Sequence, residues 1–304
     1  MNESRLTYIL KKEDEELALR SILRREFGVS TRFLRKLKDE ERIFLDGTAV
    51  KAFEKGRYGQ ALEIKMPEET NWFEPEDIPV DVLYEDEDLI VVNKQPGLVV
   101  HPTNGKPGGT MVNGLAKRMI DRNEQYKIRL VNRLDMDTSG ICIVAKNSYC
   151  QDFFMKQMQK NQVEKTYVAF VRGTLTGAGT VDLPIGRKEN DPWRRAVCDD
   201  GAPSVTHFRS LSTFEKNFSL VELVLETGRT HQIRVHMSHL GYPLISDHLY
   251  GLGEEEHYLI ARQALHACKI SFIHPRTRQR MAVEAPMPED MLRLRKRLGR
   301  EYKE

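Results

Sequence analysis

The sequence of 304 residues is poor in cysteine and contains no long apolar run. Its cysteines, Cys142, Cys150, Cys198 and Cys268, lie far apart and form no CxxC pair, which argues against a disulfide framework and a cysteine-based zinc site. Apolar runs such as 89–92 are far shorter than the ~20 residues that a membrane span needs, and the N-terminus lacks an apolar signal-peptide stretch. We therefore expect a soluble, reduced, cytoplasmic protein that engages no membrane.

The chain also lacks an excess of charge and the glycine motifs of nucleotide-binding proteins. Lys and Arg number 47 against 45 for Asp and Glu, giving a net charge of +2 that neither requires nor excludes nucleic acid. No GxxxxGK[ST] loop is present, nor a GxGxxG between a strand and a helix, so we expect neither ATP nor a nicotinamide cofactor. The length and a charged fraction of 30% are typical of a globular protein with about two domains.

The first 68 residues predict a small α/β domain, followed by a polar linker over 69–77. Residues 8–45 have helical periodicity that Gly28 interrupts, and Ser30-Thr31 is suited to cap a second helix. Strands are expected at 43–45, 49–50 and 61–65, the first two joined by an Asp46-Gly47 turn. The polar helix positions are mostly basic, which fits either a solvated face or an RNA-binding face.

From residue 78 to 304 the pattern predicts a second, larger domain of the α+β class. Strands are expected at 80–84, 89–92, 141–145, 166–171 and 220–225, and helices at 111–122, 148–159, 231–240 and 288–298. Strands and helices do not alternate strictly, which argues against a doubly wound parallel sheet.

The most informative segment is 128–146, in which an apolar stretch leads into Arg133-Leu134-Asp135 and a polar turn ending at Gly140. One interpretation pairs Asp135 with Asp137 as magnesium ligands in a DxDx[TV] phosphotransferase motif. Asn132-Arg133 interrupt the apolar strand that this fold needs, and the adjacent acidic pair 199–200 lies in a polar loop. The other interpretation makes Asp135 a nucleophile or base that a cation holds ionised.

The sequence RLDMDTSG at 133–140 resembles the RLDxxTSG signature of RluA-type RNA pseudouridine synthases. The segments 85–103, 164–173, 225–251 and 264–275 resemble further blocks of that family in the same order, so the resemblance covers about 78–290. Residues 15–66 resemble the small S-four-type RNA-binding domain. The resemblance implies a mainly antiparallel mixed sheet with flanking helices. It implies isomerisation of uridine in ribosomal, or else transfer, RNA without metal or cofactor; a noncatalytic RNA-binding protein of the same fold is the alternative. The oligomeric state has no signal in the sequence, and a monomer is the default expectation.

The same resemblance implies three catalytic residues. Asp135 is the catalytic carboxylate, Arg234 is its ion-pair partner and Tyr167 is the active-site tyrosine. Arginine suits this duty because it pairs bidentately with carboxylates and stays protonated when buried. Arg229 is a second candidate for the cation, and Thr230 is expected to cap the helix that carries Arg234.

Substrate contacts are expected from Arg133, Arg229 and Thr138. Arg133 adjoins Asp135 and is suited to fill the space that a flipped-out base leaves, or to grip phosphates. The family usually has histidine where this chain has Asn132, which we expect to tune substrate contact without abolishing activity. The basic loop 186–195 carries Trp193 and suits RNA stacking.

Three histidines raise the question of a metal site. His231, His236 and His239 have neither HExxH nor zinc-finger spacing, so structural or RNA-contacting roles are expected.

Overall fold

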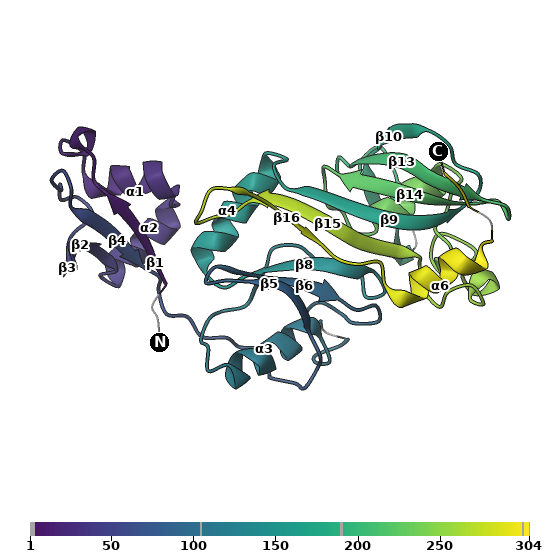
Figure 1. Cartoon of the computed structure of the whole chain (residues 1–304), viewed down its shortest axis with the longest axis horizontal. Coiled ribbons are helices and arrows are strands. Elements are labelled where there is room, and N and C mark those ends of the chain that lie inside the picture. The colour runs from purple at the N-terminus through teal and green to yellow at the C-terminus, as the bar shows by residue number, and fades with distance from the viewer. Residues whose placement is uncertain (1–3, 104, 189–190, 300, 304) are drawn as a thin grey trace.

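The computed structural model describes residues 4–103, 105–188, 191–299 and 301–303. A four-stranded sheet occupies the first 65 residues, and a sheet of 11 strands dominates the rest. Figure 1 shows the small N-terminal unit at one end of an elongated molecule and the larger unit filling the remainder. Residues 1–3 and 304, at the outer ends of the two predicted domains, lie outside the described residues. The fold is α+β and mainly antiparallel, as predicted.

The N-terminal unit consists of two helices packed on a small sheet. Its elements are β1 (Arg5–Ile9), the 3₁₀ turn η1 (Lys12–Asp14), α1 (Leu19–Phe27), α2 (Thr31–Asp39), β2 (Ile43–Leu45), β3 (Thr48–Ala49) and β4 (Ala61–Lys65), with strand order β1-β4-β2-β3. Gly28 ends α1 with φ 67°, a left-handed conformation that glycine adopts without strain. The Ser30 hydroxyl accepts a hydrogen bond from the Phe33 amide and caps α2, as predicted. Apolar side chains of both helices and the sheet form this unit's core.

The small unit is tied to the larger one through the C-terminal end of α1. Arg278 donates to the main-chain carbonyls of Glu26 and Phe27 at 3.2 and 3.0 Å, and Lys156 donates to that of Gly28 at 2.8 Å. Cations are favoured at this end because the last helix carbonyls carry partial negative charge. The helices of the small unit therefore face α4 of the larger one (Figure 1).

The large sheet has the strand order β10-β13-β14-β9-β15-β8-β6-β5, with β7 beside β8, β16 beside β15 and β17 beside β13. Its strands are β5 (Asp81–Glu85), β6 (Leu89–Lys94), β7 (Arg129–Leu130), β8 (Ser139–Ala145), β9 (Glu164–Arg172), β10 (Ala178–Asp182), β13 (Val205–Phe214), β14 (Phe218–Leu225), β15 (Leu265–Ile273), β16 (Arg280–Glu284) and β17 (Glu301–Lys303). A separate hairpin is formed by β11 (Ile185–Lys188) and β12 (Asp191–Val197). Among the described pairings, β8 with β15 is parallel and the others are antiparallel.

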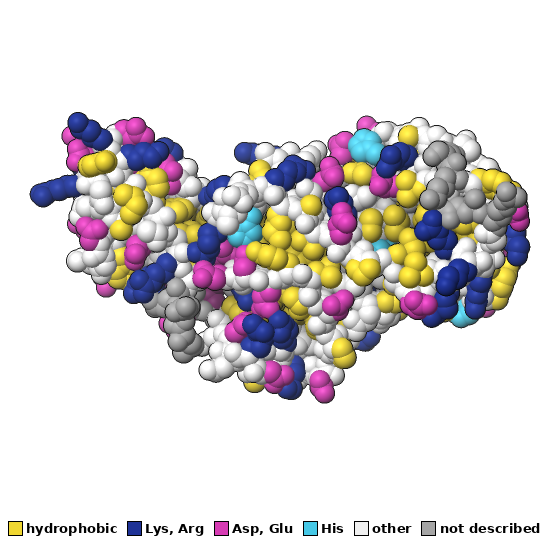
Figure 2. All heavy atoms as spheres, viewed as in Figure 1, with side chains coloured by type: hydrophobic (Ala, Val, Ile, Leu, Met, Phe, Trp, Pro, Cys, Tyr) yellow, Lys and Arg dark blue, Asp and Glu magenta, His cyan; other side chains and the backbone are white. Residues whose placement is uncertain are grey.

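The helices of the larger unit are α3 (Met111–Asp121), α4 (Ser148–Gln159), α5 (Gln232–His239), the 3₁₀ turn η2 (Gly253–Glu256) and α6 (Glu289–Arg297). Within the described part of the chain, no helix has the length and apolar character to cross a membrane. Acidic and basic side chains intermingle over the face in Figure 2, in keeping with the small net charge.

The parallel β8–β15 pair joins the half of the sheet that contains β5, β6 and β8 to the half that contains β15, β9, β14, β13 and β10. This close pairing explains the glycine of the RLDMDTSG motif. Gly140 has φ 109° and pairs with Ala267, and a Cβ at position 140 would lie 2.2 Å from the Ala267 carbonyl oxygen. Only glycine fits so close a backbone approach. Leu134, in the same motif, packs against the core clusters of both halves. The motif therefore lies where β8 of one half of the sheet meets β15 of the other.

Two local predictions are wrong, and one predicted helix is confirmed with slightly different bounds. The helix does not begin at residue 8, because Arg5–Ile9 forms β1 and pairs with the distant strand β4. The segment 186–195 is a β-hairpin and no loop, although residues 189–190 at its tip lie outside the described part. The helix predicted at 231–240 is confirmed as α5, but it begins at Gln232.

Candidate active site

Asp135 lies at the start of a tight turn between β7 and β8. The Thr138 amide donates to the Asp135 carbonyl at 3.1 Å, which closes the turn. The buried ammonium of Lys94 donates to the Met136 carbonyl in this turn at 2.7 Å, and also to the carbonyls of Gln95 and Leu98. Burial lowers the pKa of Lys94 to about 8. The turn is thus fixed by main-chain and lysine contacts, and the Asp135 side chain, 27% exposed, is left to face the pocket.

The partner of Asp135 is Arg234, as the sequence predicts. Arg234 Nη1 donates to Asp135 Oδ2 at 3.1 Å, while Nε and Nη2 donate to the two carboxylate oxygens of Asp247 at 2.7 and 2.8 Å. The arginine side chain is 6% exposed and that of Asp247 is 0% exposed. Burial lowers the pKa of Arg234, but the Asp247 and Asp135 carboxylates outweigh burial and raise it above its usual value. Arg234 is therefore a fixed cation, aimed at Asp135 by a buried bidentate ion pair.

Asp247 was not anticipated from the sequence. Its Oδ1 also accepts hydrogen bonds from the amides of Leu249 and Tyr250 at 3.0 and 3.1 Å. The Tyr250 ring lies against the Arg234 guanidinium, 5.1 Å from centroid to Cζ. Asp247 therefore anchors both Arg234 and the turn that follows it.

All six residues predicted for catalysis and substrate contact line one small pocket. They are Arg133, Asp135, Thr138, Tyr167, Arg229 and Arg234, together with His231, Gln232 and apolar neighbours. The pocket brings together five separate segments of the chain, from the 133–138 turn, β9, β14, the 229–234 segment and β15. The predicted residues are thus neighbours in space, which sequence spacing alone does not require.

Tyr167 contributes a buried ring to this pocket from β9. It is 7% exposed and packs in the core cluster that also contains Ile233 and Met237 of α5. Burial above all raises its pKa, so the phenol is protonated at neutral pH. Tyr167 offers a flat apolar surface beside Asp135.

The three predicted substrate-contacting residues lie at different depths. Arg133 and Arg229 are exposed at the rim, and Thr138 is buried, with its hydroxyl accepting from Gln263 Nε2 at 3.4 Å. The Arg229 guanidinium donates to the Pro203 carbonyl at 3.2 Å, so Arg234 is the arginine that pairs with Asp135. The rim therefore presents two cations to whatever enters the pocket.

Two local expectations need correction. The N-cap of α5 is His231, with φ 58°, and Thr230 does not cap the helix. Asn132 does not reach the pocket: its Nδ2 donates to the Ile141 carbonyl at 3.1 Å, and its Oδ1 accepts from the Ile143 amide at 2.7 Å. Its amide binds the main chain of β8, and its side chain is not among those that line the pocket.

The β11–β12 hairpin lies beside the site. The Arg195 amide donates to the Tyr250 hydroxyl at 2.8 Å, which fixes β12 against the turn that Asp247 anchors. Trp193, on the same strand, is 79% exposed. An exposed indole next to arginines is suited to stack on an unpaired base.

Both ring nitrogens of His236, one of the three histidines considered for a metal site, have hydrogen-bond partners. Its Nδ1 contacts the Thr206 hydroxyl at 2.9 Å and its Nε2 contacts the Leu183 carbonyl at 3.0 Å, so both ring nitrogens are engaged. The neighbouring His239 is exposed on the same helix, and His231 faces Asp135.

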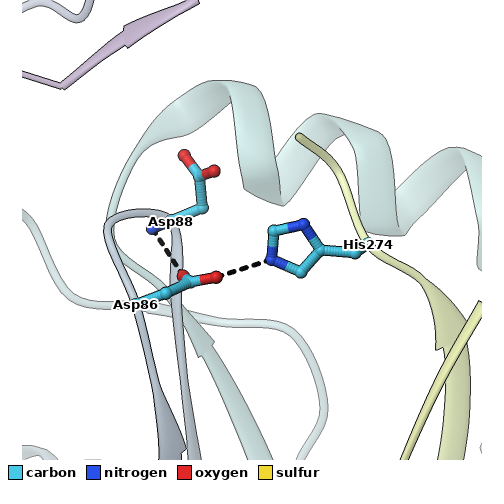
Figure 3. Close-up of side chains that lie close together, drawn as sticks. All are labelled: Asp86, Asp88 and His274. Atoms are coloured by element: carbon cyan, nitrogen blue, oxygen red, sulfur yellow. Dashed lines mark hydrogen bonds and ion pairs between the residues drawn. The ribbon is translucent and has the colours of Figure 1, made fainter. Parts of the chain in front are cut away.

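Among the described residues, the cluster whose spacing suits a metal is Asp86, Asp88 and His274 (Figure 3). His274 Nε2 lies 2.6 Å from Asp86 Oδ2, while His274 Nδ1 accepts from the amides of Arg276 and Thr277. The proton of a neutral ring is therefore on Nε2, which leaves no lone pair there for a metal. Arg276 also donates to both Asp88 oxygens at 2.8 and 3.1 Å. The donors fit an ion-pair network and do not fit a metal centre.

We expect Asp86→Asn to remove an acid-sensitive part of the stability. Burial would raise the pKa of Asp86, but hydrogen bonds from His274 and from the Leu89 and Asp88 amides outweigh it and lower the pKa to about 2. A lowered carboxyl pKa stabilises the fold above the unfolded-state value and loses that contribution as pH falls toward 2. The variant should lose about 2 kcal/mol at pH 6 and little at pH 2, measured by urea unfolding. The exposed Asp81→Asn is the matched control, and equal stability of Asp86→Asn and the parent at pH 6 would contradict the assignment.

Comparison with known proteins identifies the family. A family model described as RNA pseudouridylate synthase matches residues 88–239, half of the chain. The uncharacterized RNA pseudouridine synthase YlyB of Bacillus subtilis is 42% identical over 257 residues, covering 83% of this chain and 84% of the relative. The chain belongs to the RNA pseudouridylate synthase family. The ribosomal large subunit pseudouridine synthase D of Xanthomonas campestris is 41% identical over 263 residues, covering 82% of this synthase and 79% of that one.

A solved structure agrees with the fold of the synthase. Human RNA Pseudouridylate Synthase Domain Containing 1 superposes with a TM-score of 0.57 at 27% identity, covering 68% of this chain and 83% of the human one. The synthase is therefore an RNA uridine isomerase, and the predicted α+β synthase fold is confirmed. Gln232, Asp247 and Tyr250 were missed as site residues, and His231 was expected only in a structural or RNA-contacting role, although all four lie in the predicted block 225–251. The spacing of these residues does not predict their roles, because the roles depend on side-chain contacts that form only in the folded protein.

Proposed function

We propose that this synthase converts a uridine of large-subunit ribosomal RNA to pseudouridine, with Asp135 as the catalytic carboxylate. The substrate class follows from relatives named as ribosomal large subunit synthases, such as that of Vibrio vulnificus at 39% identity. The observation that carries the proposal is the ion pair of Asp135 with Arg234, itself anchored by buried Asp247. This contact holds the Asp135 carboxylate at the pocket, with its Oδ2 bound to a fixed cation.

The chemistry is an isomerisation with no external reactant. The bond from the ribose to N1 of uracil breaks, the base rotates, and a bond from the same ribose carbon to C5 forms. The C5 hydrogen then leaves as a proton, and N1 gains one. Asp135 acts either on the ribose or on the base, and Arg234 orients the carboxylate in both cases. Tyr167 supports the uracil ring by stacking from the floor of the pocket.

The target base has to leave its helix before it reaches Asp135. Flipping costs a few kcal/mol, which contacts with the displaced strand have to offset. Exposed Arg133 and Arg229 at the rim are suited to phosphates, and Trp193 on the β11–β12 hairpin is suited to stack on an adjacent base. Thr138 shapes the pocket from beneath. In this proposal these residues contact the extruded uridine and the strand that flanks it.

The N-terminal unit adds RNA affinity in this proposal. Residues 1–68 act as an S-four-type domain, joined through 69–77 to the catalytic domain at 78–304. Exposed basic side chains cover its helices, namely Arg20, Arg24, Arg32, Arg35 and Lys38. The joining segment is partly fixed, because Glu69 pairs with both Lys36 and Arg129 at 2.9 and 2.6 Å. We propose that the protein works as a monomer in the cytoplasm.

The test of the proposed function is tritium release from ribosomal RNA labelled at C5 of uridine. The purified synthase should release tritium in EDTA and without nucleotide, in step with the pseudouridine formed. Labelled transfer RNA, assayed in parallel, distinguishes the two RNA classes. Absence of release from either RNA by a folded protein would contradict the proposal and favour a noncatalytic RNA-binding role.

A further inference from the structure

His231 occupies a strained position next to the catalytic pair. It is the N-cap of α5 in a left-handed conformation with φ 58°, which is uncommon for a residue other than glycine. Backbone strain of this kind persists where surrounding contacts impose it, and it concentrates at functional sites. The side chain is 16% exposed, and its Nε2 lies 3.8 Å from Asp135 Oδ2. The strained conformation thus coincides with a ring directed at the catalytic carboxylate.

The ring is held by a second residue. His231 Nδ1 lies 2.9 Å from the Tyr250 hydroxyl, and the two rings meet edge to face with centroids 5.6 Å apart. The Tyr250 hydroxyl already accepts the Arg195 amide proton at 2.8 Å. Its own proton is then free to be donated to Nδ1, which places the proton of a neutral imidazole on Nε2, toward Asp135.

We propose that His231, oriented by Tyr250, is a positioning residue for Asp135, and that its Nε2–H donates to the carboxylate during the reaction. The inference rests on the proposed function, in which Asp135 is the catalytic residue. Hydrogen bonds in active sites without substrate are often long and shorten when substrate binds, so 3.8 Å suits a contact that forms in the complex. Arg234 binds the same Oδ2, so two donors together fix the direction of that oxygen and leave Oδ1 for the uridine.

A neutral His231 suits this task better than a charged one. The charged groups around it are Asp135, Arg234, Asp247 and Arg195, with the Tyr250 hydroxyl at Nδ1. Burial lowers its pKa, Asp135 raises it, and the sum lies below the usual value, so the ring is neutral above pH 6.5. A protonated His231 would be a second cation beside Asp135 and would reduce the reactivity of the carboxylate. A neutral His231 donates a hydrogen bond that orients the carboxylate.

The experiment compares His231→Gln and His231→Leu with the parent in single-turnover tritium release. Gln retains a donor near the Nε2 position without a titrating group, and Leu removes the donor. At pH 7.5 we expect the rate constant at saturating enzyme to fall about 10²-fold for Leu and about 10-fold for Gln. RNA affinity, measured separately, should stay within about twofold of the parent, because the variants lose the orientation of Asp135 and not a contact with RNA. His257→Gln, at an exposed histidine that does not line the pocket, is the matched control.

The pH profile separates positioning from general damage to the fold. In the parent, protonation of His231 should reduce the rate as pH falls below 6.5, and His231→Gln should lack this acid limb. Tyr250→Phe keeps the ring and deletes only the hydroxyl, and should cost about 10-fold in rate; Tyr258→Phe, at an exposed tyrosine, is its control. A His231→Leu rate equal to the parent rate, or an unchanged acid limb in His231→Gln, would overturn the inference. Either result in an active parent leaves the proposed function standing, whereas an inactive parent contradicts that function instead.

Discussion

Asp135→Asn is expected to reduce tritium release from labelled ribosomal RNA by at least about 10³-fold. Asparagine has the same shape but carries no charge, so it neither attacks nor acts as a base. Arg234 stays paired with Asp247 at 2.7 and 2.8 Å, and the fold should therefore be retained. The rate is measured under single turnover, with thermal unfolding as the check on folding and filter binding as the check on RNA affinity.

The matched control is Asp137→Asn, two residues along the same turn. Asp137 does not line the pocket, so this variant should keep the parent rate within about twofold. The pair of variants also separates the two chemistries considered for this motif. A magnesium-dependent phosphotransferase would need both carboxylates, whereas the isomerase needs Asp135 alone. Tritium release by Asp135→Asn at the parent rate would remove Asp135 from the mechanism.

The sequence predicts those parts of the fold that local patterns determine. The helix expected at 148–159 is observed with the same bounds, and Ser30 and Gly28 mark helix ends as expected. Strand β1 was missed because its formation depends on pairing with β4, about sixty residues later, and five residues alone carry little periodicity. The β11–β12 hairpin was missed because charged residues interrupt the apolar alternation of its strands, and its position depends on contacts with α5 and with the turn at Tyr250.

The residues of the candidate site also fall into those that local sequence predicts and those that it does not. Asp135, Tyr167 and Arg234 were predicted because they stand in long, specific motifs, and the structure brings them to one pocket. Asp247 and His231 stand in one of the same blocks, but their roles follow from side-chain contacts that no spacing encodes. Asn132 shows the reverse. Because the family usually has histidine at this position, Asn132 was predicted to affect substrate contact. In the structure its side-chain amide is hydrogen-bonded to the main chain of β8.

Arg234→Met is expected to lower both stability and activity. The substitution leaves Asp247, which is 0% exposed, without its cation, and a buried charge that loses its partner costs about 3–5 kcal/mol. The cation that pairs with Asp135 and orients it is lost as well, so the rate of tritium release should fall at least about 10²-fold. Urea unfolding measures the first effect, and single-turnover release measures the second.

The double variant Arg234→Met/Asp247→Asn separates the two effects. The asparagine side chain would carry no charge, while its carbonyl oxygen could still accept from the Leu249 and Tyr250 amides that Asp247 Oδ1 serves. We therefore expect the double variant to recover about 2 kcal/mol of the lost stability, because the uncompensated charge is gone. Activity should remain lost, since Asp135 still has no arginine. Recovery of activity together with stability would mean that Arg234 serves only the fold, and an Arg234→Met variant as stable as the parent would mean that Asp247 is not held as a buried ion.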